Sequence, residues 1–201
     1  MIKKGIILAG GLGTRMSPLT KSVNKQLLPI YDKPLIYYPI SILMLAGIRE
    51  ILIIVNKGSI GQFKKLLLNG ENFGINITYA EQKKPAGLPD AFKIGKNFIG
   101  KDNVALILGD NFLYAQSLSE KLSSITKLKK GATILAHPVK NPNRFGVVTL
   151  KGKKILNLVE KPKKTKSNLA ITGLYFFDNT VILKTLKLKK SKRKEFEIID
   201  L

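Results

Sequence analysis

GIILAGGLGTR, residues 5–15, passes from an apolar run into three closely spaced glycines and a closing arginine. Gly10, Gly11 and Gly13 suit a loop whose backbone turns through positive φ or comes close to another group. Bare backbone N–H groups beside Arg15 suit a bound phosphate. A plain tight turn is an alternative explanation of the same glycines.

Apolar segments typical of β-strands alternate with helical stretches along the first part of the chain. The strand-like segments are 5–10, 50–55, 75–80 and 104–109, and the helical stretches are 34–47, 59–70, 89–98 and 117–130. This alternation predicts an α/β fold of Rossmann-like type, a mostly parallel sheet with helices on both faces. After residue 131 a strand-rich region follows, with strand-like segments at 132–138, 145–150, 154–160 and 171–177. We expect one domain over residues 1–201, with parts 1–131 and 132–201.

The composition narrows the chemistry. The 201 residues include no cysteine and a single histidine, His137, which excludes disulfides and cysteine-bound zinc and argues against a histidine-ligated metal or a histidine-based triad. Any metal site would use oxygen ligands. The apolar segment 35–48 is too short to span a bilayer and contains Pro39. We therefore expect a soluble cytoplasmic protein with no membrane partner.

The charge raises the question of a nucleic-acid partner. There are 35 Lys and Arg against 13 Asp and Glu, a formal net charge of +22. The lysines lie in dispersed clusters without interleaved aromatic residues, which favours solvated surfaces over a nucleic-acid groove. We expect no nucleic-acid partner, although the positive field should attract anionic nucleotides.

Polar and glycine-rich segments follow three of the predicted parallel strands: residues 10–15, 81–91 and 108–111. Ligands bind such sheets beyond the carboxyl ends of the strands, so these segments should line one edge. The glycine loop matches neither a Walker A loop nor the dinucleotide-binding fingerprint, which argues against an NAD dehydrogenase. The remaining interpretation is a loop that wraps a triphosphate, with Arg15 and Lys25 supplying positive charge.

A resemblance to a known family then becomes visible. Residues 8–54, together with LGDN (108–111), NRFGVV (143–148), VEKP (159–162) and ITGLYFFDN (171–179), resemble the sugar-phosphate nucleotidyltransferases over nearly the whole chain. The run KQLLPIYDKPLIYYP (25–39) is similar to the thymidylyl branch more than to the uridylyl and adenylyl relatives. The resemblance implies Mg²⁺-dependent transfer from dTTP to α-D-glucose 1-phosphate, giving pyrophosphate and dTDP-glucose for dTDP-rhamnose and deoxysugar synthesis. A relative that uses UTP is an alternative.

The resemblance also implies site residues. In the nucleotide-binding part, 1–131, these are Leu8, Gly10, Gly11, Gly13, Thr14, Arg15, Lys25, Gln26, Gln82, Pro85, Gly87 and Asp110. Within that set Gln26 and Gln82 would meet the thymine edge, Gly87 would pack close to the base, and Asp110 would hold the magnesium. In the sugar-phosphate-binding part, 132–201, they are Phe145, Gly146, Glu160, Lys161, Thr172 and Gly173. The catalytic set would be Arg15, Lys25, Asp110 and Lys161.

The implied chemistry needs no histidine or cysteine. A sugar phosphate has a second pKa near ~6 and is already ionised at neutral pH, so it attacks without a general base. The protein's task is to bring two anions into line and to stabilise charge at the α-phosphate. Ordinary structural roles stay open from the residues alone: Asp110 as a turn cap, Gln82 as a loop amide and Lys161 as exposed surface.

The chain departs from the family in three places. Pro89 and Asp90 stand where the family usually has an Ala-Gln pair, and a negative charge there could weaken triphosphate binding. Phe145 replaces a tyrosine. Family members continue beyond EFEIIDL (195–201) through another strand, a second metal-binding aspartate and helices used in oligomer contacts. We therefore expect a C-terminally truncated domain with low turnover, in which a homo-oligomer is doubtful. A catalytically inactive binding remnant and a basic nucleic-acid-binding protein are the alternatives.

Overall fold

The structure is a computed structural model that describes residues 1–11, 13–152, 154–191 and 193–201. Its strands are β1 (Lys4–Ala9), β2 (Pro29–Ile30), β3 (Lys33–Pro34), β4 (Glu50–Asn56), β5 (Asn76–Gln82), β6 (Val104–Leu108), β7 (Ala132–Pro138), β8 (Gly146–Lys151), β9 (Lys154–Glu160) and β10 (Leu169–Phe177). Its α-helices are α1 (Tyr37–Leu45), α2 (Ile60–Leu67), α3 (Asp90–Ile94), α4 (Lys96–Ile99), α5 (Leu118–Ile125) and α6 (Val181–Lys187). Short 3-10 helices are η1 (Thr14–Met16), η2 (Leu19–Lys21), η3 (Lys25–Leu27), η4 (Glu71–Phe73), η5 (Pro142–Arg144) and η6 (Ile198–Asp200).

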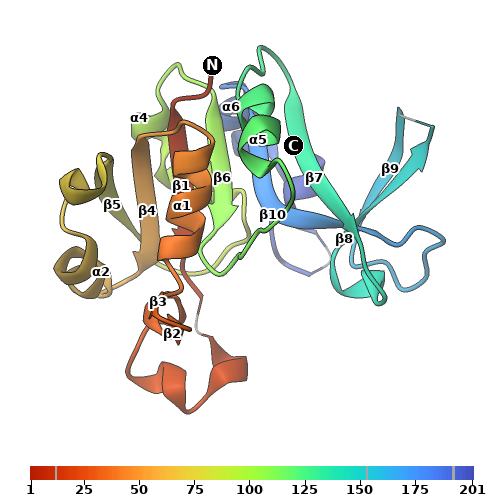
Figure 1. Ribbon diagram of the computed structural model, residues 1–201. Helices are drawn as coiled ribbons and strands as arrows, with labels where there is room; N and C mark the ends of the chain where they lie inside the picture. Colours follow the sequence, from red (N-terminus) through yellow and green to blue (C-terminus); the bar gives the residue numbers. More distant parts are fainter. Residues whose placement is uncertain (12, 153, 192) are drawn as a thin grey trace.

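One large sheet runs through the molecule in the order β5-β4-β1-β6-β10-β8-β9, and β7 also pairs with β10 (Figure 1). The strands β5, β4, β1 and β6 are parallel, as the sequence predicts, and the later strands join them antiparallel. The chain leaves β1 toward β4 on one side and reaches β6 on the other. The switch in direction therefore lies between the ends of β1 and β6, where such sheets bind ligands.

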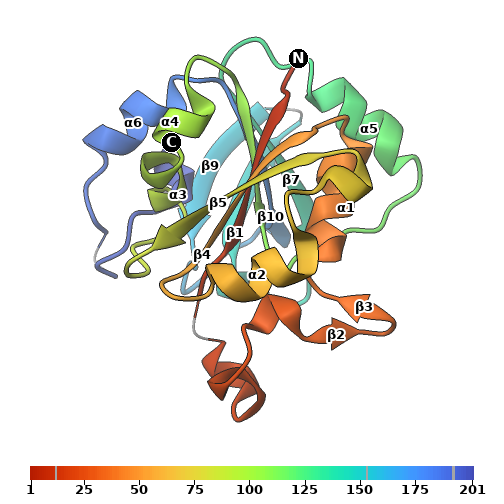
Figure 2. The same cartoon turned by 90° about the vertical axis from the view of Figure 1, so that its left-hand side faces the viewer.

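Helices cover both faces of the sheet, which confirms the predicted layering (Figure 2). One face packs against α1, α2 and α5 through a core that includes Ile40, Leu43, Phe63 and Leu122. The other face packs against α3, α4 and α6 through a core that includes Phe92. Burial on both faces explains why the parallel strands read as continuous apolar runs rather than as alternating patterns.

The helix predicted over 89–98 is wrong as a single element, because it is divided at Gly95 into α3 and α4. A Cβ on Gly95 would lie 2.9 Å from Ile6 Cδ1 and 3.1 Å from Leu52 Cδ2. The backbone comes so close to the sheet at this position that a side chain has no room. The glycine serves as the boundary between two short helices.

The strand-rich part builds a second wall beside the parallel sheet. The register between β7 and β10 shifts between Ile171 and Tyr175. Thr172 and Gly173 lie in this irregular stretch, which brings them toward the end of β6. Within the described ranges, no helix combines the length and the apolar character needed to cross a membrane.

Candidate active site

The glycine loop after β1 is held from the neighbouring strand β4. Asn56, the last residue of β4, accepts a hydrogen bond from the Gly11 N–H and donates one to the Gly11 carbonyl, each at 2.9 Å. Gly11 has φ +108° and Gly13 φ +58°, so the loop uses the left-handed backbone that the sequence predicts. Sequence reasoning missed Asn56. The signal in the sequence that could have identified Asn56 is a polar residue at the end of a buried strand.

Cations and polar groups surround this loop. Thr20 Oγ1 donates to the Gly13 carbonyl at 2.8 Å, and the predicted residues Thr14 and Arg15 are exposed in η1. A small cavity of about 160 Å³ beside the loop includes Gly11 and Lys25 in its lining. Leu8, half-buried in β1, accepts a hydrogen bond from the Gly109 N–H at 2.9 Å, which joins the ends of β1 and β6.

Lys25 and Asp110 meet at this junction although 85 residues separate them. Their side chains form an ion pair at 2.6 Å, and both remain about one third exposed. Asn111 Nδ2 donates to Asp110 Oδ1 at 3.3 Å. Asp110 is thus a held and accessible carboxylate rather than a simple turn cap. In the described part of the chain, here included, no three histidine or carboxylate groups gather as a metal site.

Gln26 and Gln82 approach the same edge from two directions. Gln26 is only 3% exposed, lies against Gly109, and its Oε1 accepts no hydrogen bond among the described residues. A buried acceptor without a partner at a ligand edge fits a group that meets a bound molecule. Gln82 Nε2 donates to Asp90 Oδ2 at 3.0 Å. Asp90, one of the residues expected to depart from the family pattern, therefore contacts Gln82, which is predicted to meet the thymine edge.

The loop from Lys83 to Pro89 carries the predicted residues Pro85, which is exposed, and Gly87. Gly87 has φ +106°, and a Cβ there would lie 2.2 Å from the Phe196 carbonyl oxygen. Phe196 N in turn donates to the Ala86 carbonyl at 3.0 Å. The space next to this glycine is therefore occupied by residues 193–198, a segment near the C-terminus that we call the strap. Its expected contact with a base stays a prediction.

A cavity of about 850 Å³ lies between the end of β6 and the strands β8, β9 and β10. Its lining includes every residue predicted for the sugar phosphate: Phe145, Gly146, Glu160, Lys161, Thr172 and Gly173. Gly87 and Asn111 also line it. Residues that are far apart in sequence are thus brought together around one space.

The β8–β9 pair explains the positions of four of these residues. Gly146 lies opposite Glu160 in the ladder, and a Cβ on Gly146 would be 3.0 Å from Glu160 Oε2. The Lys161 N–H donates to the Phe145 carbonyl at 3.0 Å. Lys161 has φ +43°, and its Nζ lies 3.9 Å from Glu160 Oε1. Lys161, directly after Glu160, thus has a backbone conformation that is uncommon for lysine.

Arg193 is the main residue that sequence reasoning missed on this side. Its guanidinium lies 3.2 Å from Glu160, 2.9 Å from Glu195 and 3.5 Å from Glu197. Burial raises the pKa of Glu160, and the neighbouring Glu197 adds to this, while Lys161 and Arg193 partly offset it. In the sequence, Arg193 lies in a lysine-rich segment, and such a composition is typical of an ordinary solvent-exposed surface.

Asn111 connects the two parts of the site. Its Oδ1 accepts from the Gly173 N–H at 3.1 Å, while its Nδ2 donates to Asp110. Beside it, Thr172 Oγ1 is buried and forms no hydrogen bond among the described residues. One amide therefore ties the carboxylate at the end of β6 to the irregular stretch of β10. The nucleotide-side and sugar-side residues consequently share a boundary.

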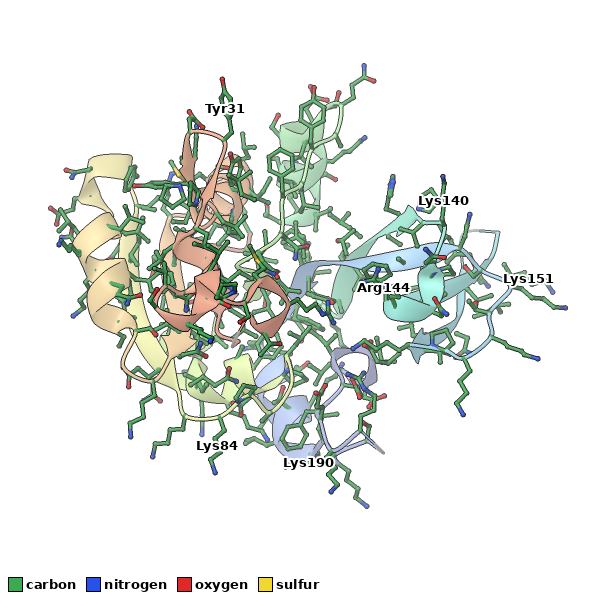
Figure 3. All side chains as sticks on the ribbon, turned by 90° about the horizontal axis from the view of Figure 1, so that it is seen from below. Tyr31, Lys84, Lys140, Arg144, Lys151 and Lys190 are labelled. Carbon is green, nitrogen blue, oxygen red and sulfur yellow. The ribbon has the colours of Figure 1, made fainter. Side chains whose placement is uncertain are left out.

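The charge of the chain is spread around this region. Figure 3 views the molecule from below Figure 1, the side on which the loops after β1 and β6 lie. The labelled lysines Lys84, Lys140 and Lys151 project outward from the periphery (Figure 3). Such a dispersed positive field favours the approach of anionic small molecules to the exposed edge.

Comparisons with known proteins agree with this architecture. The family model described as Nucleotidyl transferase matches residues 4–201. The glucose-1-phosphate thymidylyltransferase of Neisseria meningitidis serogroup A is 54% identical over 199 residues, which cover 98% of this chain and 69% of that relative. The enzyme of the same name from Mycolicibacterium smegmatis is 52% identical, with 98% and 68% covered. This chain is thus shorter than both relatives.

Solved structures give the same picture. A Bacillus anthracis protein assigned as a glucose-1-phosphate thymidylyltransferase, solved in complex with sucrose, is 40% identical with a TM-score of 0.90, covering 98% of this chain and 80% of that one. A UDP-glucose pyrophosphorylase complexed with UDP-glucose is 28% identical with a TM-score of 0.85, covering 100% of this chain and 85% of that one.

Proposed function

Because the chain belongs to the nucleotidyl transferase family, we propose that it transfers the thymidylyl group of dTTP to glucose 1-phosphate, giving dTDP-glucose and pyrophosphate. One observation carries the proposal. The cavity lined by the predicted sugar-phosphate residues meets the Lys25 and Asp110 pair at Asn111. Two anionic substrates bound on either side of Asn111 would therefore approach each other at that pair.

The residues act by position and charge. The backbone of the glycine loop, with Arg15 and Lys25, would hold and neutralise the phosphates of dTTP. Lys161 and Arg193 line the other cavity and would orient the phosphate of the sugar. That phosphate is already ionised at neutral pH, so it attacks the α-phosphate without a general base, and pyrophosphate leaves. The reaction is accelerated because the two phosphates are held close together and in line, and because charge at the α-phosphate is stabilised electrostatically.

Magnesium is part of the proposal, and the donor chemistry fits it. Mg²⁺ binds through one or two carboxylates and completes its shell with water and substrate phosphates. Asp110 offers an accessible carboxylate at the place where those phosphates would lie. When bound, the ion would neutralise developing charge on the phosphate oxygens. Lys25 Nζ pairs with the same carboxylate at 2.6 Å and would keep it oriented.

We place the product in the cytoplasmic synthesis of dTDP-rhamnose and related deoxysugars, as the family resemblance implies. A UTP-using enzyme is the second candidate, favoured by the likeness to the pyrophosphorylase solved with UDP-glucose. The test measures pyrophosphate release with glucose 1-phosphate and Mg²⁺ against dTTP and UTP in parallel. Faster release with dTTP supports the proposal, and faster release with UTP favours the second candidate. Release with neither nucleotide would contradict both.

A further inference from the structure

The amide of Gln82 lies between Asp90 and the glycine loop. Gln82 ends β5, is only 5% exposed, and donates from Nε2 to the Asp90 carboxylate at 3.0 Å. Its other amide atom, Oε1, lies over the loop, because a Cβ on Gly10 would be 2.9 Å from it. The two ends of this amide therefore face different neighbours.

The chemistry of Asp90 decides which end faces which neighbour. A carboxylate offers only acceptor oxygens, so the group that it binds must be the NH₂ of the amide. The oxygen of Gln82 is thereby directed away from Asp90 and toward the loop. A neutral amide at position 90 could either donate or accept, and would leave both orientations of Gln82 open.

A fixed oxygen selects among pyrimidines. Thymine and uracil carry an N–H donor at N3, whereas the N3 of cytosine is an acceptor and its donor lies one position along the edge. Two acceptors that face each other in a buried site cannot form a hydrogen bond, and both lose their solvation. Sites built around one hydrogen-bonding pattern reject the mismatched ligand strongly for this reason.

We propose that Asp90 is a positioning residue that fixes the Gln82 amide with its oxygen toward the nucleotide, and thereby makes the site prefer bases with an N3–H donor over cytosine. This inference rests on the proposed function and deepens it. Asp90 acts through Gln82 and does not itself touch the base.

The test compares dUTP and dCTP, which differ only in the base edge, in displacement titrations against labelled dTTP. The unaltered protein should bind dUTP at least about tenfold more tightly than dCTP. Asp90→Asn keeps the shape but can also donate to Gln82, so the preference should fall to about threefold or less. Asp90→Glu keeps an acceptor-only group and should retain much of the preference. Thermal unfolding of each variant is recorded alongside, and Asp90→Ala serves the same test if Asp90→Asn does not fold.

Asp102→Asn is the matched control for charge. Asp102 pairs with Lys4 at 2.8 Å, before the start of β6 and so at the opposite edge of the parallel sheet. It should leave the preference unchanged. An equal weakening of dUTP and dCTP by Asp90→Asn would mean that Asp90 only supports the fold, and would overturn the inference. An unaltered preference in Asp90→Asn, or none in the original protein, would also overturn it. If dTTP itself does not bind, both the inference and the proposed function fail, whereas the outcomes above overturn the inference alone.

Discussion

The two ends of the candidate site are built in different ways. At the nucleotide end, neutral amide side chains hold the loop that follows β1: Asn56 of the neighbouring strand β4 bonds to Gly11, and Asn24 Oδ1, within the same loop, accepts from the Gln26 N–H. At the sugar end, β8, β9, β10 and the strap of residues 193–198 meet around a cavity, and charged groups such as Glu160 and Arg193 join them. The first end depends on local loop geometry. The second depends on contacts between distant segments.

The largest effect is expected where the two ends meet. Asp110→Asn removes the carboxylate that pairs with Lys25 and should lower turnover about 10²- to 10³-fold, the size seen when one preorganised electrostatic group is lost. The fold should persist, because Asp110 is partly exposed. Steady-state pyrophosphate release checks the rate, and thermal unfolding checks the fold.

Asp32→Asn provides the control for Asp110→Asn. Asp32 also pairs with a lysine, Lys33, at 3.0 Å, but both lie exposed at the turn between β2 and β3. Its loss should leave turnover nearly unchanged, since exposed pairs contribute little. Equal activity of Asp110→Asn and the original protein would remove Asp110 from the catalytic set.

The next effect concerns the dependence of the sugar end on distant contacts. Gly87→Ala would place a methyl group 2.2 Å from the Phe196 carbonyl oxygen at a residue with φ +106°. We expect the free energy of unfolding to fall by about 2–4 kcal/mol, from backbone strain plus overpacking. Displacement of the strap should also raise the KM for glucose 1-phosphate. Urea denaturation and initial rates measure the two.

Gly58→Ala separates the two causes. Gly58 has φ +80°, but nothing lies within 4 Å of the added Cβ. Only strain is introduced, so we expect a loss of about 1 kcal/mol. Equal losses at Gly58 and Gly87 would mean that the contact between the strap and the loop contributes nothing to stability.

The same difference between the ends explains what the sequence could predict. The parallel strands, the helices between them and the loops at their ends followed from apolar runs and glycines, because these are local signals. The prediction of a single helix over 89–98 was wrong because the backbone at Gly95 packs too closely against Ile6 and Leu52 to leave room for a side chain. Ile6 and Leu52 are distant from Gly95 in the sequence. Local periodicity does not carry that information.

The candidate site divides in the same manner. The residues around the cavity were named through family motifs, and the structure brings them together. Asn56 and Arg193 were not named, because the local signals of one amide at a strand end and of an arginine among lysines are too weak to single them out. Their positions depend on the strand register and on the path of the strap, which only the folded chain defines.

A smaller effect sharpens the description of the nucleotide end. Asn56→Ala removes both hydrogen bonds to Gly11, worth about 1–3 kcal/mol together, so the Kd for dTTP should rise about tenfold. The Kd for glucose 1-phosphate should stay the same, because Asn56 does not line the larger cavity. Isothermal titration with each ligand measures both. Asn76→Ala, at the exposed start of β5, is the control, and a matching loss of affinity there would contradict the assignment.

The smallest effect tests the charged character of the sugar end through pH. Burial and Glu197 raise the pKa of Glu160 above the ordinary glutamate value of 4.5. The folded state therefore holds this proton more tightly than the unfolded state does. The resulting stabilisation is fully present below the unfolded pKa and is lost as the pH rises through the folded pKa. Glu160→Gln should remove this loss.

The variant should match the original protein near pH 4 and exceed its free energy of unfolding at pH 7. The gain should be below about 1 kcal/mol, because the group is partly exposed and screened. Urea denaturation between pH 4 and pH 7 measures it. Glu195→Gln, which removes a different carboxylate partner of Arg193, is the control. A Glu160→Gln protein that becomes less stable than the original as the pH rises would show that Arg193 and Lys161 more than compensate the burial of this carboxylate. The charges at the sugar end would then stabilise the fold rather than oppose it.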